Sequence, residues 1–311
     1  MLTVDVVRRV WTLVCTVVLA VTGCTSQAPP PLGASQLAGT PSVSAAVAQS
    51  HVDRPPAQPG YRGRPEGTVV GGQPLTYVAT ARGGTIGLLW LDAARLHFRY
   101  VPGRLYPERG PILAVDRVPS TWTGRMVAAF NGAFKLSDGV GGYYYAGTTV
   151  SRLRAGLASL VIDSSGRLSV LVWGKAPIVL HGLQVVRQNL PPLVDQSRAQ
   201  TSPSDSNHTW GWADHGNRLA NRSALAEMSD HSLVYVYGHQ LTAADMAAVI
   251  VRLHAVTAIM LDMNLSQPGG FVYAHQGSAV LGRRILPTIY HNPSVYQSWY
   301  KKDFVVASPR P

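Results

Sequence analysis

The sequence predicts an α+β fold: a single strand-rich domain with a mixed sheet and a few helices. Two observations predict this class. Short segments rich in β-branched and aromatic residues recur from Leu75 onward, separated by glycine- and proline-containing breaks, a pattern typical of short strands. Near the C-terminus, one amphipathic segment lies between two such strands, and this order predicts a strand-helix-strand unit.

The predicted strands are short and end at turn-forming residues. Gly83-Gly84 and Pro102-Gly103 interrupt the first of them, because glycine and proline favour turns over strand interiors. Ser164-Ser165-Gly166 lies between two strands and predicts a hairpin. The strands expected are Leu75–Ala81, Thr85–Leu91, Arg95–Val101, Met126–Phe130, Ser159–Asp163, Leu168–Trp173, Ser232–Tyr237 and Ala258–Leu261.

One helix is predicted, over Ala243–His254. Thr242 precedes it as an N-cap and Asp245 follows three positions later, the spacing of a capping box. Apolar side chains recur on one face at helical spacing, which predicts that this face packs against the core. They are Met246, Val249, Ile250 and Leu253.

The N-terminus has the parts of a secretory signal peptide over residues 1–23. Arg8 and Arg9 give a positive end, and Val10–Ala20 gives an apolar stretch too short to span a bilayer. Val21-Thr22-Gly23-Cys24 resembles a bacterial lipobox, which implies that Cys24 carries a lipid and holds the protein on the extracytoplasmic face of the cell membrane. The alternative is an ordinary signal peptide followed by a chance cysteine.

A tether and a globular head are expected after the signal. Residues 24–67 are rich in Pro, Ala, Ser and Gly, so we expect a disordered tether. Residues 68–308 suit one domain. The formal net charge is +11, which favours anionic partners such as lipid head groups, envelope glycans or phosphate-bearing polymers. Nucleic acid is not expected, because the chain is predicted to be exported and shows no Lys/Arg run.

Several common catalytic motifs are absent, among them H-E-x-x-H, the P-loop and G-x-S-x-G. Ser298 and Lys301 match S-x-x-K by chance. His208 and His215, with Asp214 nearby, fit no zinc spacing, so we predict no metal site from these residues. The sequence requires no cofactor, although it leaves a divalent cation open.

Three other segments stand out for their polar residues beside predicted strands. They are Phe130–Phe134, Asn221–Leu225 and Leu261–Asn264. In this order and spacing they resemble the phosphodiester glycosidase family, whose members include N-acetylglucosamine-1-phosphodiester alpha-N-acetylglucosaminidase, in its actinobacterial lipoprotein branch. That family has an N-G-G-F-like turn, an R-T-A-like segment and an L-D-G-G-G-S-like strand end. Further similar segments are Gly141–Tyr144, Arg187–Pro191 and Thr209–Gly211.

The resemblance implies a hydrolase acting on a sugar-1-phosphate linkage in a surface glycan or glycolipid, with the family segments supplying its site. Asp262 is expected as nucleophile, base or electrostatic stabiliser, and Arg222 as the clamp on the phosphate. Asn131 is the third expected catalytic residue. The expected substrate-binding residues are Gly132, Lys135, Asp138, Asn264 and Trp210.

Two alternatives stay open. Arg222 and Asp262 would serve structure alone if they paired with each other as a buried bridge. The head would be a non-catalytic envelope protein if its cleft recognised a glycan or phosphate polymer without cleaving it. The chain also departs from the family pattern: Ala133 replaces a glycine, Ser223 stands where Thr is usual, and Met263-Asn264 replaces a glycine-rich run. We expect Met263 to obstruct the approach of a ligand to the backbone.

Overall fold

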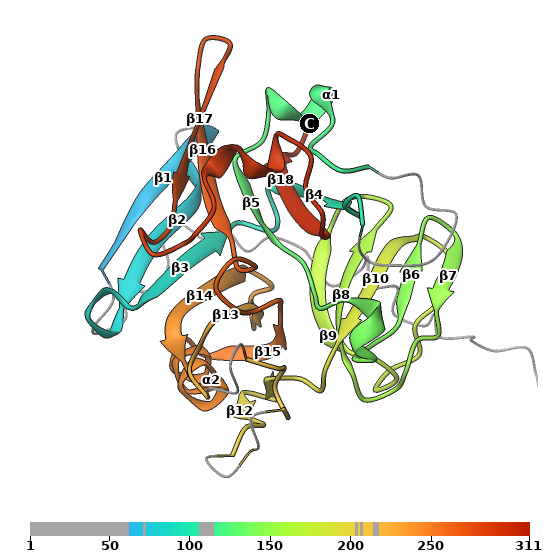
Figure 1. The fold of residues 1–311 in the computed structure, drawn as a ribbon. Helices are drawn as coiled ribbons and strands as arrows, with labels where there is room; N and C mark the ends of the chain where they lie inside the picture. Colours follow the sequence, from blue (N-terminus) through green and yellow to red (C-terminus); the bar gives the residue numbers. More distant parts are fainter. Residues whose placement is uncertain (1–61, 71–72, 106–114, 203–204, 206–207, 214–217) are drawn as a thin grey trace, which may run out of the picture. The chain divides into compact units, whose positions relative to one another are not determined.

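Short strands are the predominant regular elements in the part of the chain that the computed structural model describes, namely residues 62–70, 73–105, 115–202, 205, 208–213 and 218–311 (Figure 1). These residues lie in the compact unit Ala45–Pro311. The predicted signal peptide, Cys24 and the tether up to residue 61 lie outside the described residues. Strand β1 (Arg62–Val70) contains the last residues of the predicted tether. No helix among the described residues is long and apolar enough to cross a membrane.

The largest sheet has eight strands in the order β1-β2-β3-β14-β13-β15-β11-β12. Apolar residues alternate along its central strands: Leu233, Tyr235 and Tyr237 of β14 join one core cluster, and Val234 and Val236 join the other. Both faces are therefore buried. After β1, its strands are β2 (Gln73–Ala81), β3 (Ile86–Leu91), β14 (Leu233–Leu241), β13 (Ala220–Met228), β15 (Ala255–Met260), β11 (Val194–Asp195) and β12 (Arg198–Ala199).

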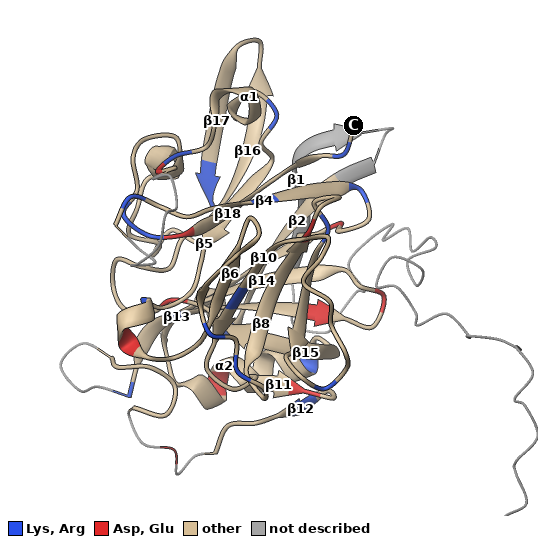
Figure 2. Ribbon diagram, turned by 90° about the vertical axis from the view of Figure 1, so that its right-hand side faces the viewer, with Lys and Arg blue, Asp and Glu red and all other residues tan. Residues whose placement is uncertain are grey.

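Two five-stranded sheets complete the strand framework. The second sheet has the order β7 (Thr148–Ser151), β6 (Tyr143–Tyr145), β10 (Leu183–Asn189), β8 (Ala158–Asp163) and β9 (Leu168–Val172). The third has the order β17 (Ala279–Arg284), β16 (Gly270–Gln276), β5 (Ala128–Asn131), β18 (Phe304–Pro309) and β4 (Leu96–Val101). The β16–β17 hairpin extends away from the other strands of its sheet in both ribbon views (Figures 1 and 2).

Helices are few among the described residues. α1 (Ser120–Thr123) is a single turn, and α2 (Ala243–Arg252) follows β14. The 3-10 turns are η1 (Arg82–Gly84), η2 (Leu136–Asp138) and η4 (Pro293–Tyr296). The predicted capping box is present: the Thr242 hydroxyl accepts from the Asp245 N–H at 3.0 Å. The predicted apolar face, with Met246, Val249 and Ile250, packs against the first sheet.

The predicted α+β class with a mixed sheet is wrong: the fold is largely β, with three sheets whose described strand pairs are all antiparallel. The strand-helix-strand order β14-α2-β15 does occur. However, β13 lies between β14 and β15 and pairs with both in the antiparallel sense. The crossover therefore creates no parallel pair, and strands that the sequence did not predict fill the rest of the sheets.

Candidate functional site

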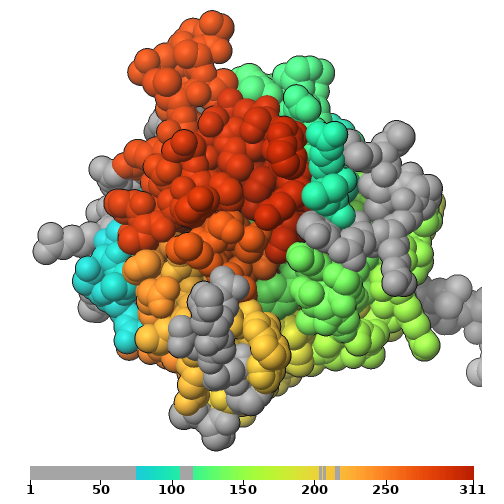
Figure 3. Space-filling view, viewed as in Figure 1, coloured from blue at the N-terminus to red at the C-terminus, as the bar shows by residue number. Residues whose placement is uncertain are grey.

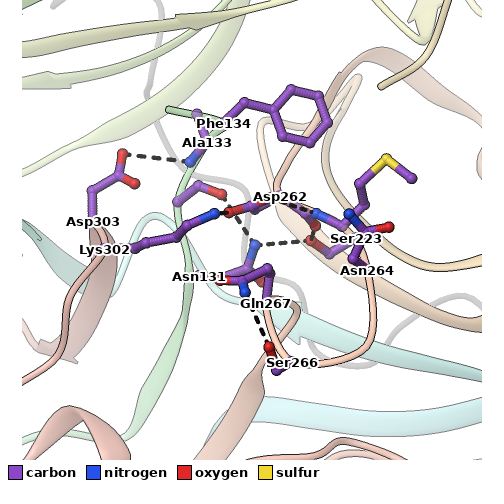
Figure 4. A network of polar contacts seen from close by, with 12 residues as sticks. Asn131, Ala133, Phe134, Ser223, Asp262, Asn264, Ser266, Gln267, Lys302 and Asp303 are labelled. Carbon is purple, nitrogen blue, oxygen red and sulfur yellow. Dashed lines mark hydrogen bonds and ion pairs between the residues drawn. The ribbon is translucent and has the colours of Figure 1, made fainter. Parts of the chain in front are cut away.

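The three segments singled out in the sequence meet at the ends of β5, β13 and β15. The Asn131 amide donates to the Ser223 hydroxyl at 3.0 Å, and this hydroxyl donates to the Asp262 carbonyl oxygen at 2.7 Å (Figure 4). The Asp262 N–H donates to the carbonyl oxygen of Gly132 at 2.9 Å. These bonds fix the backbone on either side of Asp262.

Asn131 acts as the connector of this arrangement and does not border an open space. Its side chain is buried, and its second amide contact is a bond to the Gly132 carbonyl at 3.0 Å. Its Oδ1 accepts from the Tyr235 hydroxyl at 2.8 Å and from the Gly269 N–H at 3.1 Å. Because both polar atoms of the amide are engaged by protein groups, Asn131 serves the geometry of the site.

A cleft of about 870 Å³ lies beside this junction. Its walls come from the segment after β5, from the chain around His208–Trp212, from the residues after β15, and from those before β18. On the face seen in Figure 3, the green segment after β5 and the red C-terminal segment lie side by side. The lining residues include Phe134, Lys135, Asp138, His208, Gly211, Trp212, Asp262, Met263, Asn264, Ser266, Gln267, Lys301 and Lys302.

Asp262 is the buried acid of the cleft, with 4% of its surface exposed. Its Oδ1 accepts from the Met263 N–H at 2.8 Å, and its Oδ2 accepts from the Lys302 ammonium. Burial raises the pKa of Asp262 to about 6, against the lowering effects of Lys302 and the Met263 N–H. The carboxylate is therefore charged at neutral pH and close to its titration range.

A second buried network holds Lys302 against Asp262. The next residue, Asp303, forms an ion pair with Arg187 at 3.0 Å and accepts from the Tyr100 hydroxyl at 2.7 Å. Arg187 also donates to the Phe134 carbonyl oxygen. A Cβ on Gly132 would lie 2.5 Å from the Asp303 carboxyl carbon, so glycine is needed there for close packing. Strand β18 thus begins at a fixed position relative to the turn after β5.

Arg222 does not meet Asp262 and points into a different, much smaller cavity of about 30 Å³. Its guanidinium donates to the carbonyl oxygens of Leu241 at 2.9 Å and of Trp210 at 2.8 Å. Burial lowers the pKa of Arg222 to about 10. The buried Arg222–Asp262 bridge considered above is not formed, and the guanidinium holds the surrounding backbone.

The expected substrate-binding residues divide into two groups. Lys135, Asp138 and Asn264 line the cleft. Gly132 packs against Asp303 as described. Trp210 is buried and lines the small cavity with Arg222, and its indole N–H donates to Asp205 at 2.7 Å.

Several lining residues were not predicted from the sequence as site residues, among them Lys301, Lys302, His208 and Trp212. Lys301 was assigned to a chance S-x-x-K match, and no motif marks Lys302. The one sequence signal that could have marked them was the adjacent pair of lysines, Lys301 and Lys302. His208 was considered only as a metal ligand. Among the described residues, no group of three or more His, Cys, Asp or Glu side chains could hold a metal ion, and His215 and Asp214 lie outside them.

No protein-family model matches the chain, and no curated protein matches it. Among solved structures, the catalytic domain of zebrafish N-acetylglucosamine-1-phosphodiester alpha-N-acetylglucosaminidase, auto-inhibited by its pro-peptide, is similar with a TM-score of 0.47 and 13% identity, covering 83% of this chain and 92% of that chain. A hypothetical protein from Synechocystis has a TM-score of 0.38 and 11% identity, covering 81% and 62%. A putative exported protein from Burkholderia pseudomallei K96243 has a TM-score of 0.33 and 11% identity, covering 77% and 75%.

Proposed function

We propose that the cleft hydrolyses a glycosyl phosphodiester, the linkage between an anomeric carbon and a phosphate, in a cell-envelope glycan or glycolipid. One observation carries the proposal: a buried carboxylate, Asp262, lies in a large cleft that also contains Lys135, Lys301 and Lys302. A carboxylate beside an ammonium group suits a substrate that develops positive charge on a sugar and negative charge on a leaving phosphate. The resemblance of the three sequence segments favours the same chemistry.

The lysines supply the cationic side of the reaction. An ammonium group has three N–H donors, and Asp262 accepts one of those of Lys302. A phosphate bound beside Lys302 would reach an ammonium group whose position is fixed by the start of β18. Arg222 lines the other cavity, so in this proposal the phosphate is bound by lysines.

The hydrolysis step uses Asp262 as a general base. A water molecule attacks the anomeric carbon and its oxygen forms the new bond, while the carboxylate takes one proton of that water. The bond between the anomeric carbon and the phosphate oxygen breaks, and the phosphate monoester leaves with the bonding electron pair. A pKa near the operating pH is the range in which a general base is effective, and that of Asp262 is about 6.

A second candidate is binding without cleavage, favoured by one observation: both carboxylate oxygens of Asp262 already accept protein hydrogen bonds. Such a carboxylate would repel phosphate less than a free one, and the lysines would then bind an anionic glycan. This candidate predicts tight binding of the same ligands with no release of sugar.

The test incubates the purified full chain with phenyl phosphodiesters of glucose, mannose and N-acetylglucosamine 1-phosphate and measures the reducing sugar released. Asp262→Asn keeps the shape and removes the base, so the rate should fall by about 10²–10⁴-fold. Asp195→Asn is the matched control, because Asp195 also pairs with a lysine, Lys175, at 2.5 Å but lies outside the cleft. Equal rates in the parent and the Asp262 variant would refute the mechanism, and binding without sugar release would favour the second candidate.

A further inference from the structure

Trp212 is exposed at the cleft, although an indole is a large apolar group that is ordinarily buried. Of its surface, 67% is exposed, and its ring stacks on His208 with centroids 3.9 Å apart and planes 28° apart. Both residues line the same cleft as Asp262 and the lysines. The stack therefore presents a flat aromatic face beside a cationic, acid-containing site.

The residues that follow Asp262 contact and hold the backbone that carries Trp212. The Asn264 amide donates to the Trp212 carbonyl oxygen at 3.0 Å. Gly211 has φ +92°, and a Cβ there would lie 2.6 Å from the Met263 sulfur and 2.6 Å from the Phe134 ring. Met263 is buried, so its side chain supports Gly211.

Arg222 fixes the same segment from its other side through its bond to the Trp210 carbonyl oxygen. The Met263 sulfur lies 3.4 Å from this guanidinium, which links the two supports. Three residues from the family-like segments, Arg222, Met263 and Asn264, thus position one short stretch of chain. Their common consequence is the placement of the Trp212 ring.

We infer that the Trp212–His208 stack is a binding subsite for a sugar ring, next to the anion-binding lysines of the cleft. One face of a pyranose consists of C–H groups, and an indole face packs against such a surface with its large apolar area and negative quadrupole. The remaining hydroxyls of the sugar would face the polar lining residues, of which Asn264 and Gln267 border the cleft. This inference deepens the proposed function, on which it rests for the identity of the ligand as a sugar phosphate.

The volume of the cleft is large enough for a ligand that contains a sugar ring and further groups. A drug-sized ligand fills a pocket of roughly 300–1,000 Å³, and the cleft measures about 870 Å³. It therefore has room for a sugar on Trp212 together with a phosphate at the lysines and the group attached to it.

Calorimetric binding to the purified full chain tests the subsite without any turnover. The probes are N-acetylglucosamine 1-phosphate, glucose 1-phosphate and, as a charge-matched ligand without a ring, glycerol 1-phosphate. Trp212→Ala should weaken binding of the two sugar phosphates by about tenfold, the usual order for one aromatic contact, and leave glycerol 1-phosphate binding unchanged. Trp212→Phe should retain most of the affinity.

Trp299→Ala is the matched control, because Trp299 is also 53% exposed but contacts Arg104 and is not a lining residue. Sugar-phosphate affinities that are equal in the parent, the Trp212→Ala variant and this control would overturn the inference, as would a parent that binds glycerol 1-phosphate as tightly as the sugar phosphates. Because no bond is cleaved, loss of hydrolysis alone leaves this result intact. Conversely, if hydrolysis persists but the binding of sugar phosphates does not depend on Trp212, the subsite is refuted and the proposed reaction stands.

Discussion

The titration of Asp262 gives the proposed reaction a defined pH dependence. Burial raises its pKa to about 6, so the carboxylate is protonated below that pH and charged above it. A carboxyl group must be deprotonated to act as a base, and we therefore expect kcat/KM to fall about tenfold per pH unit below about pH 6. A rate profile over pH 4–8 with the parent chain checks this. A rate that stays constant down to pH 4 would show that this carboxylate is not the base.

Lys302 sets where that titration occurs, because its charge lowers the pKa of Asp262. Lys302→Met removes the charge and should move the acidic limb of the profile to higher pH. It also leaves a buried carboxylate without its partner, a change that costs about 3–5 kcal/mol of stability. A folded-state pKa above that of the unfolded chain means that stability is lost as the pH rises through the folded pKa. Urea unfolding should therefore show a larger deficit at pH 8 than at pH 5.

Lys175→Met is the control for this change, since Lys175 pairs with Asp195 at the surface. This variant should leave the acidic limb of the pH profile where it is and change the stability by no more than about 0.5 kcal/mol. A Lys302 variant whose limb coincides with that of the parent would contradict the coupling of the two groups.

Gly132 is required for close packing against Asp303, and its substitution tests this requirement. A Cβ at position 132 would lie within 2.6 Å of two side-chain atoms of Asp303 and 2.8 Å from its carbonyl oxygen. Gly132→Ala should cost about 1–3 kcal/mol through overpacking, measured by urea unfolding. Gly124→Ala is the control, because nothing lies within 4 Å of a Cβ there and its φ is −71°. Equal stabilities of the two variants would contradict the close approach of Gly132 and Asp303.

At the scale of the elements, Asn131 joins three parts of the fold. It ends β5, accepts from Tyr235 of β14 and from the Gly269 N–H before β16, and donates to Ser223 of β13. Asn131→Ala would leave buried donors without acceptors, at about 1–3 kcal/mol for each. We expect a lower unfolding midpoint in urea. If stability were unchanged and only turnover were lost, Asn131 would belong to the reacting groups.

Elements marked by local sequence signals were predicted, and elements fixed by distant partners were not. The helix α2 is predicted because its capping residues, Thr242 and Asp245, are three positions apart. The hairpin β8–β9 is predicted because its turn lies between its strands. Strand β13 was missed because its neighbours bury both of its faces, so its small residues, such as Ala224 and Ala226, show no alternation.

The same distinction holds within the site. Asp262 could be predicted because it directly follows a strand and belongs to a recognisable segment. Lys302 could not, since its position depends on the pairing of β18 with β5, in which Phe304 lies opposite Asn131. The pair that anchors it, Arg187 and Asp303, joins residues 116 positions apart. No local sequence pattern indicates a contact between residues so far apart in the chain.

At the scale of the whole molecule, the error in fold class has one source. A helix between two strands predicted a parallel pair, but the strand β13 inserts between them. Sequence patterns report which elements form and do not report which strand occupies the space between two others.

The most direct measurement of the central claim is hydrolysis in water enriched in oxygen-18, using the glycosyl phosphodiester that the chain cleaves fastest. Attack at the anomeric carbon places the label in the released sugar and leaves the phosphate monoester unlabelled, and mass spectrometry of the phosphate product reads this directly because its oxygens do not exchange. The account predicts an unlabelled phosphate monoester. Label in that product would show cleavage of the phosphorus–oxygen bond, and the cleft would then be a phosphodiesterase site in which Asp262 does not act at the sugar.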